Sequence, residues 1–133
     1  MPEDKTKLLR ICYWIGAIAD VLAACLMLFP SWGGIFYGIP DFKPSPEYKY
    51  AMYLGASLML GWTVLLLWAD RKPVERMGIL IITVFPVVAG LALAGLYAVL
   101  NNYISFGRML PTWIFQLVIS VLAIYSYRVN KLY

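Results

Sequence analysis

The side chain with the greatest chemical potential is Asp20, the one charged residue in the apolar stretch 11–29. Nineteen helical residues at ~1.5 Å each span about 28 Å, which matches the hydrocarbon core of a bilayer. An ionised carboxylate at that depth costs roughly 2.5–3.5 kcal/mol on insertion scales. Gly16, Ala23, Ala24 and Met27 share its helix face, and small residues let another helix approach closely. We therefore expect Asp20 to point into the protein rather than into lipid.

Each of the other apolar spans places a hydrogen-bonding side chain near the expected level of Asp20. These side chains are Ser57, Thr83, Gln116 and Ser120, of which the last two lie four residues apart on one helix face. One interpretation is a small polar pocket, or a proton or cation site, around a carboxylate. The other is interhelical hydrogen bonding worth about 0.6–2 kcal/mol per bond. Asp20 favours the first, because asparagine would serve structure without the ionisation penalty.

The charge state of Asp20 follows from its surroundings, since no lysine or arginine lies within the four apolar spans. Desolvation then makes a protonated, neutral carboxyl the simplest state. A bound cation is an alternative, but no second carboxylate lies at the same level. A second alternative is Arg10, which would have to reach across ten residues of helix. We therefore expect a neutral carboxyl.

The elements that must position these side chains are four membrane-spanning helices. Of the 133 residues, 62% are hydrophobic and only 14% are charged, which excludes an ordinary water-soluble domain. The uncharged stretches predict spans at 11–29, 50–69, 77–100 and 111–127, with Pro86 kinking the third and Pro111 beginning the fourth. Residues 1–10 are expected to form a short charged tail. The predicted fold is all-α, an integral membrane four-helix bundle in a single domain, 1–133.

The connections between the spans indicate how the chain is oriented. Residues 30–49 form a long outer loop with four prolines and three glycines, so they cannot form one regular helix. Their aromatic first half is expected in the membrane interface or folded over the mouth of the bundle. The N-terminus, the 70–76 turn and the C-terminus hold eight of the 11 lysines and arginines. The positive-inside rule then predicts a multi-pass protein of the cell membrane with both termini cytoplasmic.

The composition also excludes several kinds of chemistry. The sequence has no histidine, which removes imidazole-based haem, zinc and nucleophile sites. Cys12 and Cys25 lie about 20 Å apart along one helix, too far for a disulfide. We therefore predict no cofactor, no metal site and no catalytic residues. The net charge of +4 is typical of topology and contact with anionic lipid rather than of nucleic-acid binding.

Two resemblances to known families bear on function. The four short spans, the FP…FYGIP stretch after the first span and the YLGASLMLG segment resemble the DoxX-like class of small four-helix membrane proteins. That resemblance implies a membrane-embedded subunit or accessory protein and assigns no site residue. GAIADVLAACLMLF resembles the first helix of small multidrug-resistance transporters, in which a membrane carboxylate exchanges protons for a cationic drug. Asp20 stands at that position, with Asp in place of Glu.

The functional prediction is a non-enzymatic binding or accessory protein with a small polar pocket around Asp20. The alternative is a proton-coupled carrier of a small cation or lipophilic amine. The charge bias of the loops argues against the dual insertion that an antiparallel transporter dimer needs. Expected partners are membrane lipids and a lipid-like or small-molecule ligand. A homo-oligomer and a separate membrane partner both stay open.

Overall fold

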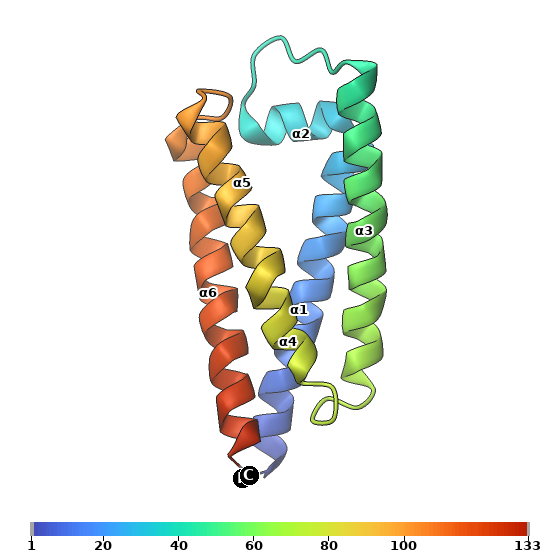
Figure 1. Ribbon diagram of the computed structural model, residues 1–133, viewed down its shortest axis with the longest axis vertical. Helices are drawn as coiled ribbons and strands as arrows, with labels where there is room; N and C mark the ends of the chain where they lie inside the picture. The colour runs from blue at the N-terminus through green and yellow to red at the C-terminus, as the bar shows by residue number, and fades with distance from the viewer. Residues whose placement is uncertain (1, 133) are drawn as a thin grey trace.

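The computed structural model describes residues 2–132, which contain helices and no strand. The elements are α1 (Pro2–Leu28), α2 (Pro30–Tyr37), α3 (Pro46–Asp70), α4 (Gly78–Ile82), the π-helical turn η1 (Thr83–Val88), α5 (Ala89–Leu100) and α6 (Phe106–Lys131). Because α4, η1 and α5 run on as one segment, four helices are long and apolar enough to cross a membrane (Figure 1). The all-α four-helix membrane bundle is thereby confirmed, and the chain is a multi-pass membrane protein.

The first and last helices begin earlier than the sequence interpretation placed them. The predicted tail is wrong for residues 2–10, because α1 already begins at Pro2. Proline in the first turn, followed by Glu3 and Asp4, suits a helix N-terminus and its dipole. In α6, Pro111 lies inside the helix rather than at its start, because the chain turns helical directly after the extended Ser105. Both helices therefore project beyond the predicted spans.

The middle two spans follow the prediction closely. Ser45 caps α3 by accepting a hydrogen bond from the Tyr48 backbone N–H at 3.2 Å, and Pro46 occupies the first turn. The third span breaks where expected: Phe85, directly before Pro86, has φ −123° and ψ 112°, which is non-helical. The peptide bond between these two residues is cis. The predicted kink in the third span is confirmed.

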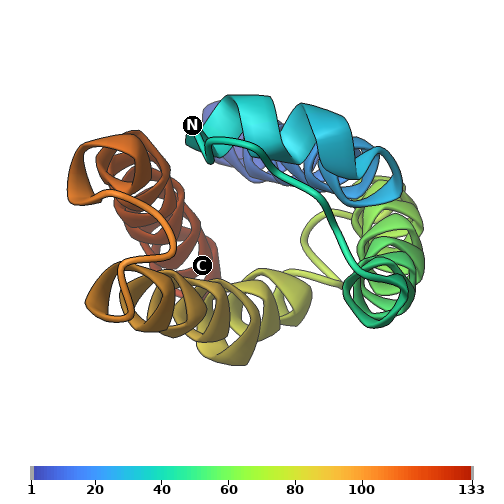
Figure 2. The same ribbon diagram turned by 90° about the horizontal axis from the view of Figure 1, so that it is seen from above.

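The bundle is organised around α1, which packs along α3 on one side and against α6 on the other. The α4–η1–α5 span packs against α6 (Figures 1 and 2). The helices lie closest at the end that holds both termini and spread apart toward the opposite end (Figure 1). Leu9, Tyr13, Leu66 and Leu80 are fully or almost fully buried in the core of the tighter half. Asn130 Nδ2 joins the two ends of the chain by donating to the Lys5 carbonyl.

The opposite end of the bundle is crossed by α2, which lies roughly perpendicular to the spans (Figure 1). This helix ends at Gly38, whose φ of 66° is left-handed and favours glycine. The backbone N–H of Ile39 then donates to the Gly34 carbonyl at 2.9 Å and closes the turn. The expectation that residues 30–49 form no single regular helix is confirmed, and their first half crosses the bundle end.

Candidate functional site

Asp20 lies on the face of α1 that looks toward α3. One turn earlier, a Cβ added to Gly16 would stand 3.0 Å from Leu66 Cδ1, which shows how closely the two helices approach on this side. The Asp20 side chain is half-buried, and its Oδ2 atom is shielded completely. Among the described residues 2–132, no donor contacts that oxygen. Asp20 therefore holds an unsatisfied acceptor inside the bundle.

Gln116 on α6 repeats this feature at the same depth. Its Oε1 is also shielded and has no hydrogen-bond partner in the described part of the chain. The hydrogen bond between Asn130 and the Lys5 carbonyl fixes how α1 and α6 run past each other. Asp20 follows Lys5 by 15 residues and Gln116 precedes Asn130 by 14. At ~1.5 Å per residue, both lie roughly 21–23 Å from that hydrogen bond.

Thr83 lies at the depth of Asp20 because it is hydrogen-bonded to Trp62, a residue that the sequence interpretation missed. The ion pair of Arg10 with Asp70 and the approach of Met27 to Gly55 define the register of α1 and α3. Between these contacts, the antiparallel helices place Asp20 beside about residues 60–62. Trp62 Nε1 donates to Thr83 Oγ1 at 3.0 Å. The signal in the sequence was an indole N–H in an apolar span, because a buried tryptophan N–H usually finds an acceptor.

The remaining two predicted site residues do not complete the group. Ser57 is exposed and donates to the carbonyl of Tyr53 in its own helix at 3.0 Å, so it faces away from the site. Ser120 is half-buried one turn beyond Gln116, and its hydroxyl makes no hydrogen bond within residues 2–132. The structure thus brings Asp20, Thr83 and Gln116 to one depth and leaves Ser57 out.

The site contains two shielded oxygens, on Asp20 and Gln116, that no donor of residues 2–132 contacts. The Trp62 N–H is already used by Thr83, which in turn donates to the Ile79 carbonyl at 2.8 Å. A buried acceptor without a partner costs about 1–3 kcal/mol. The groups that complement the Asp20 and Gln116 oxygens are a proton on the carboxyl and an N–H or O–H of a bound molecule.

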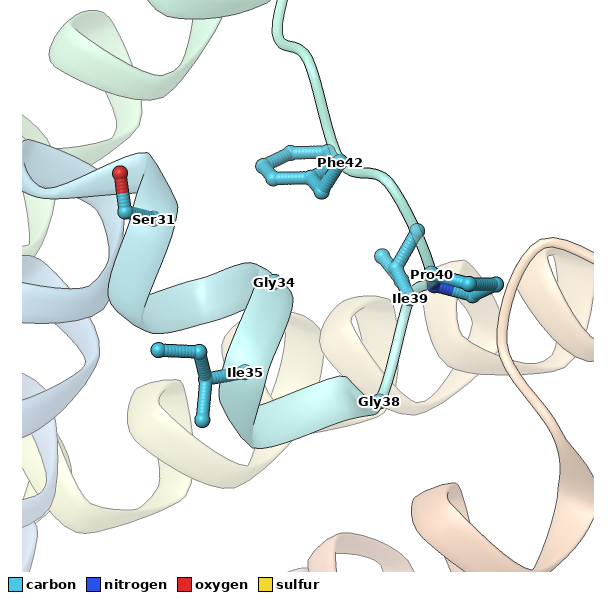
Figure 3. A pocket seen from close by; sticks show the side chains of 7 residues that line it. All are labelled: Ser31, Gly34, Ile35, Gly38, Ile39, Pro40 and Phe42. Atoms are coloured by element: carbon cyan, nitrogen blue, oxygen red, sulfur yellow. The ribbon is translucent and has the colours of Figure 1, made fainter.

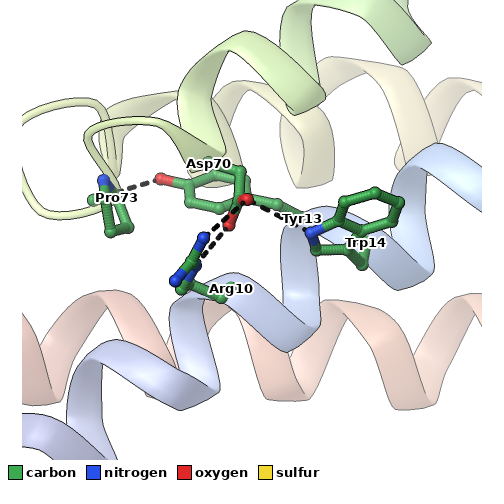
Figure 4. A network of polar contacts seen from close by, with 5 residues as sticks. All are labelled: Arg10, Tyr13, Trp14, Asp70 and Pro73. Carbon is green, nitrogen blue, oxygen red and sulfur yellow. Dashed lines mark hydrogen bonds and ion pairs between the residues drawn. The ribbon is translucent and has the colours of Figure 1, made fainter.

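A second polar cluster connects α1 to the end of α3 and includes Arg10 (Figure 4). Arg10 Nε lies 2.9 Å from Asp70 Oδ1, and Arg10 Nη2 donates to Asp70 Oδ2 at 3.2 Å. Trp14 Nε1 donates to the same Oδ2 at 3.2 Å, and Tyr13 donates to the Pro73 carbonyl at 2.8 Å. Asp70 is only 8% exposed. Arg10 is therefore the partner of Asp70, and the Asp20 carboxyl has no guanidinium beside it.

Residues 2–132 contain no group of three or more Cys, Asp or Glu side chains that could hold a metal ion. Cys12 and Cys25 are free thiols, and Cys12 is buried. Comparison of the chain with protein-family models, with curated proteins and with solved structures finds no match. What the protein does must therefore be inferred from the geometry of the bundle.

Proposed function

We propose that this protein is a membrane-embedded binding or accessory protein with a small polar pocket around Asp20. The observation that carries the proposal is the pair of shielded acceptors, Asp20 Oδ2 and Gln116 Oε1, at one depth on two helices. Two such oxygens without donors are costly in an apolar span, and ionisable groups at this depth are usually functional. The ligand is a small lipophilic molecule that carries an N–H or O–H donor.

We also propose an orientation for the chain in the membrane. Both termini and the 70–76 turn face the cytoplasm of the cell, and α2 faces outward. Eight of the 11 lysines and arginines support this arrangement by lying at the end that holds the termini.

Calorimetric titration of the detergent-purified protein with phenethylamine, a small lipophilic amine, tests the proposal. Wild-type protein is expected to bind the amine, because its ammonium N–H groups supply the missing donors. Asp20→Asn should weaken binding at least tenfold, or about 1.4 kcal/mol. The matched control is Asp41→Asn, which removes an exposed carboxylate from the outer loop and should leave the affinity unchanged. Equal affinity of Asp20→Asn and wild type would contradict the proposal.

A second candidate is a proton-coupled carrier of a small cation or lipophilic amine. The observation that favours it is the non-helical backbone at Phe85, two residues from Thr83. Discontinuous helices are typical of the binding sites of transporters. Proteoliposomes with an imposed pH gradient separate the two functions. Amine uptake that Asp20→Asn abolishes would establish the carrier, whereas binding without uptake would leave the accessory protein.

A further inference from the structure

A hollow of about 380 Å³ lies between α2 and the segment that follows it, at the end of the bundle away from the termini (Figure 3). Its wall is apolar along Ile35, Ile39 and Phe42, with the Ser31 hydroxyl at one end. Figure 3 shows Phe42 lying over α2 at Gly34. The hollow is separate from Asp20, which lies eight residues before the end of α1 and does not line it.

Two glycines give the hollow its shape. A Cβ added to Gly34 would stand 2.6 Å from Phe42 Cδ1, so the aromatic ring can close over α2 only because position 34 has no side chain. A Cβ added to Gly38 would stand 2.9 Å from Arg108 Nε. The guanidinium at the start of α6 therefore reaches the rim of the hollow, where α2 ends.

Arg108 brings a positive charge that the protein does not neutralise. Its side chain is exposed, and within residues 2–132 it forms no ion pair. Asp41, the nearest carboxylate along the chain from Gly38, forms none either. A guanidinium is well suited to phosphate, because its planar fork of N–H groups can bind two phosphate oxygens at once.

The outward face of α2 places this charge beside apolar surface. Trp32 is 53% exposed and Ile35 76% exposed, on a helix that directly follows a membrane-spanning helix. Exposed tryptophan at the end of a span is typical of the depth of lipid headgroups. The rim therefore offers a cation at the level of headgroups, and the wall offers an apolar surface to an acyl chain.

We propose that the hollow and Arg108 form a binding site for one anionic phospholipid, with its phosphate on the Arg108 guanidinium and an acyl chain along Ile35 and Phe42. Charge complementarity favours an anionic lipid over a zwitterionic one, because the phosphate of the latter already has its own counter-charge. The site does not depend on Asp20 or on the ligand proposed for it.

Native mass spectrometry of the intact, detergent-solubilised protein tests this assignment by titration with phosphatidylglycerol and phosphatidylcholine. The wild type is expected to retain one phosphatidylglycerol at least tenfold more tightly than phosphatidylcholine. Arg108→Gln should remove that preference, and Arg108→Lys should keep part of it. The matched control is Arg128→Gln, which removes an exposed arginine from the other end of the same helix and should keep the preference.

A second variant tests the apolar wall. Gly34→Ala should push Phe42 away from α2 and weaken the binding of both lipids, while melting in detergent shows whether the variant is folded. A preference retained by Arg108→Gln, or lost equally in Arg108→Gln and Arg128→Gln, would overturn the proposal. Competition by inorganic phosphate as strong as that by phosphatidylglycerol would also overturn it, because the acyl chain would then contribute nothing.

Discussion

Two substitutions separate two properties of the Asp20 side chain, its capacity for hydrogen bonding and its capacity to ionise. Asp20→Asn keeps the first and removes the second, so we expect a thermal unfolding midpoint equal to or above that of the wild type. Asp20→Leu removes both. Since Asp20 makes no hydrogen bond within residues 2–132, the free energy of unfolding of Asp20→Leu should equal or exceed that of the wild type, and a loss of about 1–2 kcal/mol would show instead that Asp20 holds helices together.

Infrared difference spectra between about pH 5 and 9 provide the complementary measurement. A carboxyl band that changes in this window and is absent from Asp20→Asn would establish a titrating site. A band that never changes, together with unaltered binding of phenethylamine by Asp20→Asn, would show that Asp20 binds neither the ligand nor a proton in this pH range.

Substitution of Gln116 should change protein stability and amine binding in opposite directions. Gln116→Met keeps the length of the side chain and removes an acceptor that has no partner, so the ligand-free protein should become more stable by roughly 1–3 kcal/mol. Binding of the amine should weaken in the same variant. Thermal unfolding in detergent and calorimetric titration measure the two effects. Ser57→Ala is the control, since Ser57 is exposed and bonded within its own helix, and should change neither.

Part of the candidate site could be predicted from residue types. Asp20, Thr83 and Gln116 are polar groups near the middle of apolar spans, and span length alone sets their depth. Ser57 met the same criterion, but its position around the helix axis turns it outward, and depth says nothing about that angle. Trp62 carries an N–H donor in an apolar span, but residue type alone does not identify Thr83 on another helix as its acceptor.

At the scale of elements, the ion pair between Arg10 and Asp70 is the main polar connection between α1 and α3. Asp70→Asn should lower the unfolding midpoint in detergent by roughly 2–4 °C, because the carboxylate accepts from both Arg10 and Trp14. Arg10→Gln should act in the same direction. In the double variant the loss of stability should be smaller than the sum of the two single losses, because both substitutions remove the same ion pair. Full additivity would show that the pair contributes nothing.

The small residues show which contacts between helices can be predicted from sequence. Small residues recur at a spacing of four as Ala51-Gly55 and Ser57-Gly61 in α3 and as Gly90-Ala94-Ala98 in the third span, and this pattern predicts helix seams. Gly55 does lie against Met27, whereas Gly95, which is outside this pattern, lies against Met109. Gly61 and Gly90 have nothing within 4 Å of an added Cβ, so the seams predicted there are wrong. Spacing places residues on a common helix face, but it does not say whether that face meets protein or lipid.

At the scale of the whole molecule, orientation is the prediction that is easiest to test. Reporter fusions after Lys131 and within residues 41–49 should report opposite compartments, with the fusion after Lys131 in the cytoplasm. Removing the positive charges of Arg71, Lys72 and Arg76 together should weaken that preference. Equal labelling of both sites from outside the cell would contradict a fixed orientation and favour dual insertion.

The bundle could be predicted as a set of spans but not as an arrangement. Backbone groups in lipid must be satisfied within each helix, so hydropathy alone specifies how many helices there are and roughly where they lie. Which helices become neighbours depends on side-chain packing between them, because lipid is as apolar as the helix surfaces. The position of α1 between α3 and α6 therefore had no signal in composition.

That position has a consequence for biosynthesis. Among the described helices, α1 is synthesised first, yet α6, one of its two principal neighbours, is synthesised after all the others. Until Asn130 is synthesised, its hydrogen bond to the Lys5 carbonyl, which joins α6 to α1, cannot form. Until α6 is inserted, the α6-facing side of α1 must therefore be covered by lipid or by the insertion machinery, so the bundle cannot finish assembling before α6 has been synthesised.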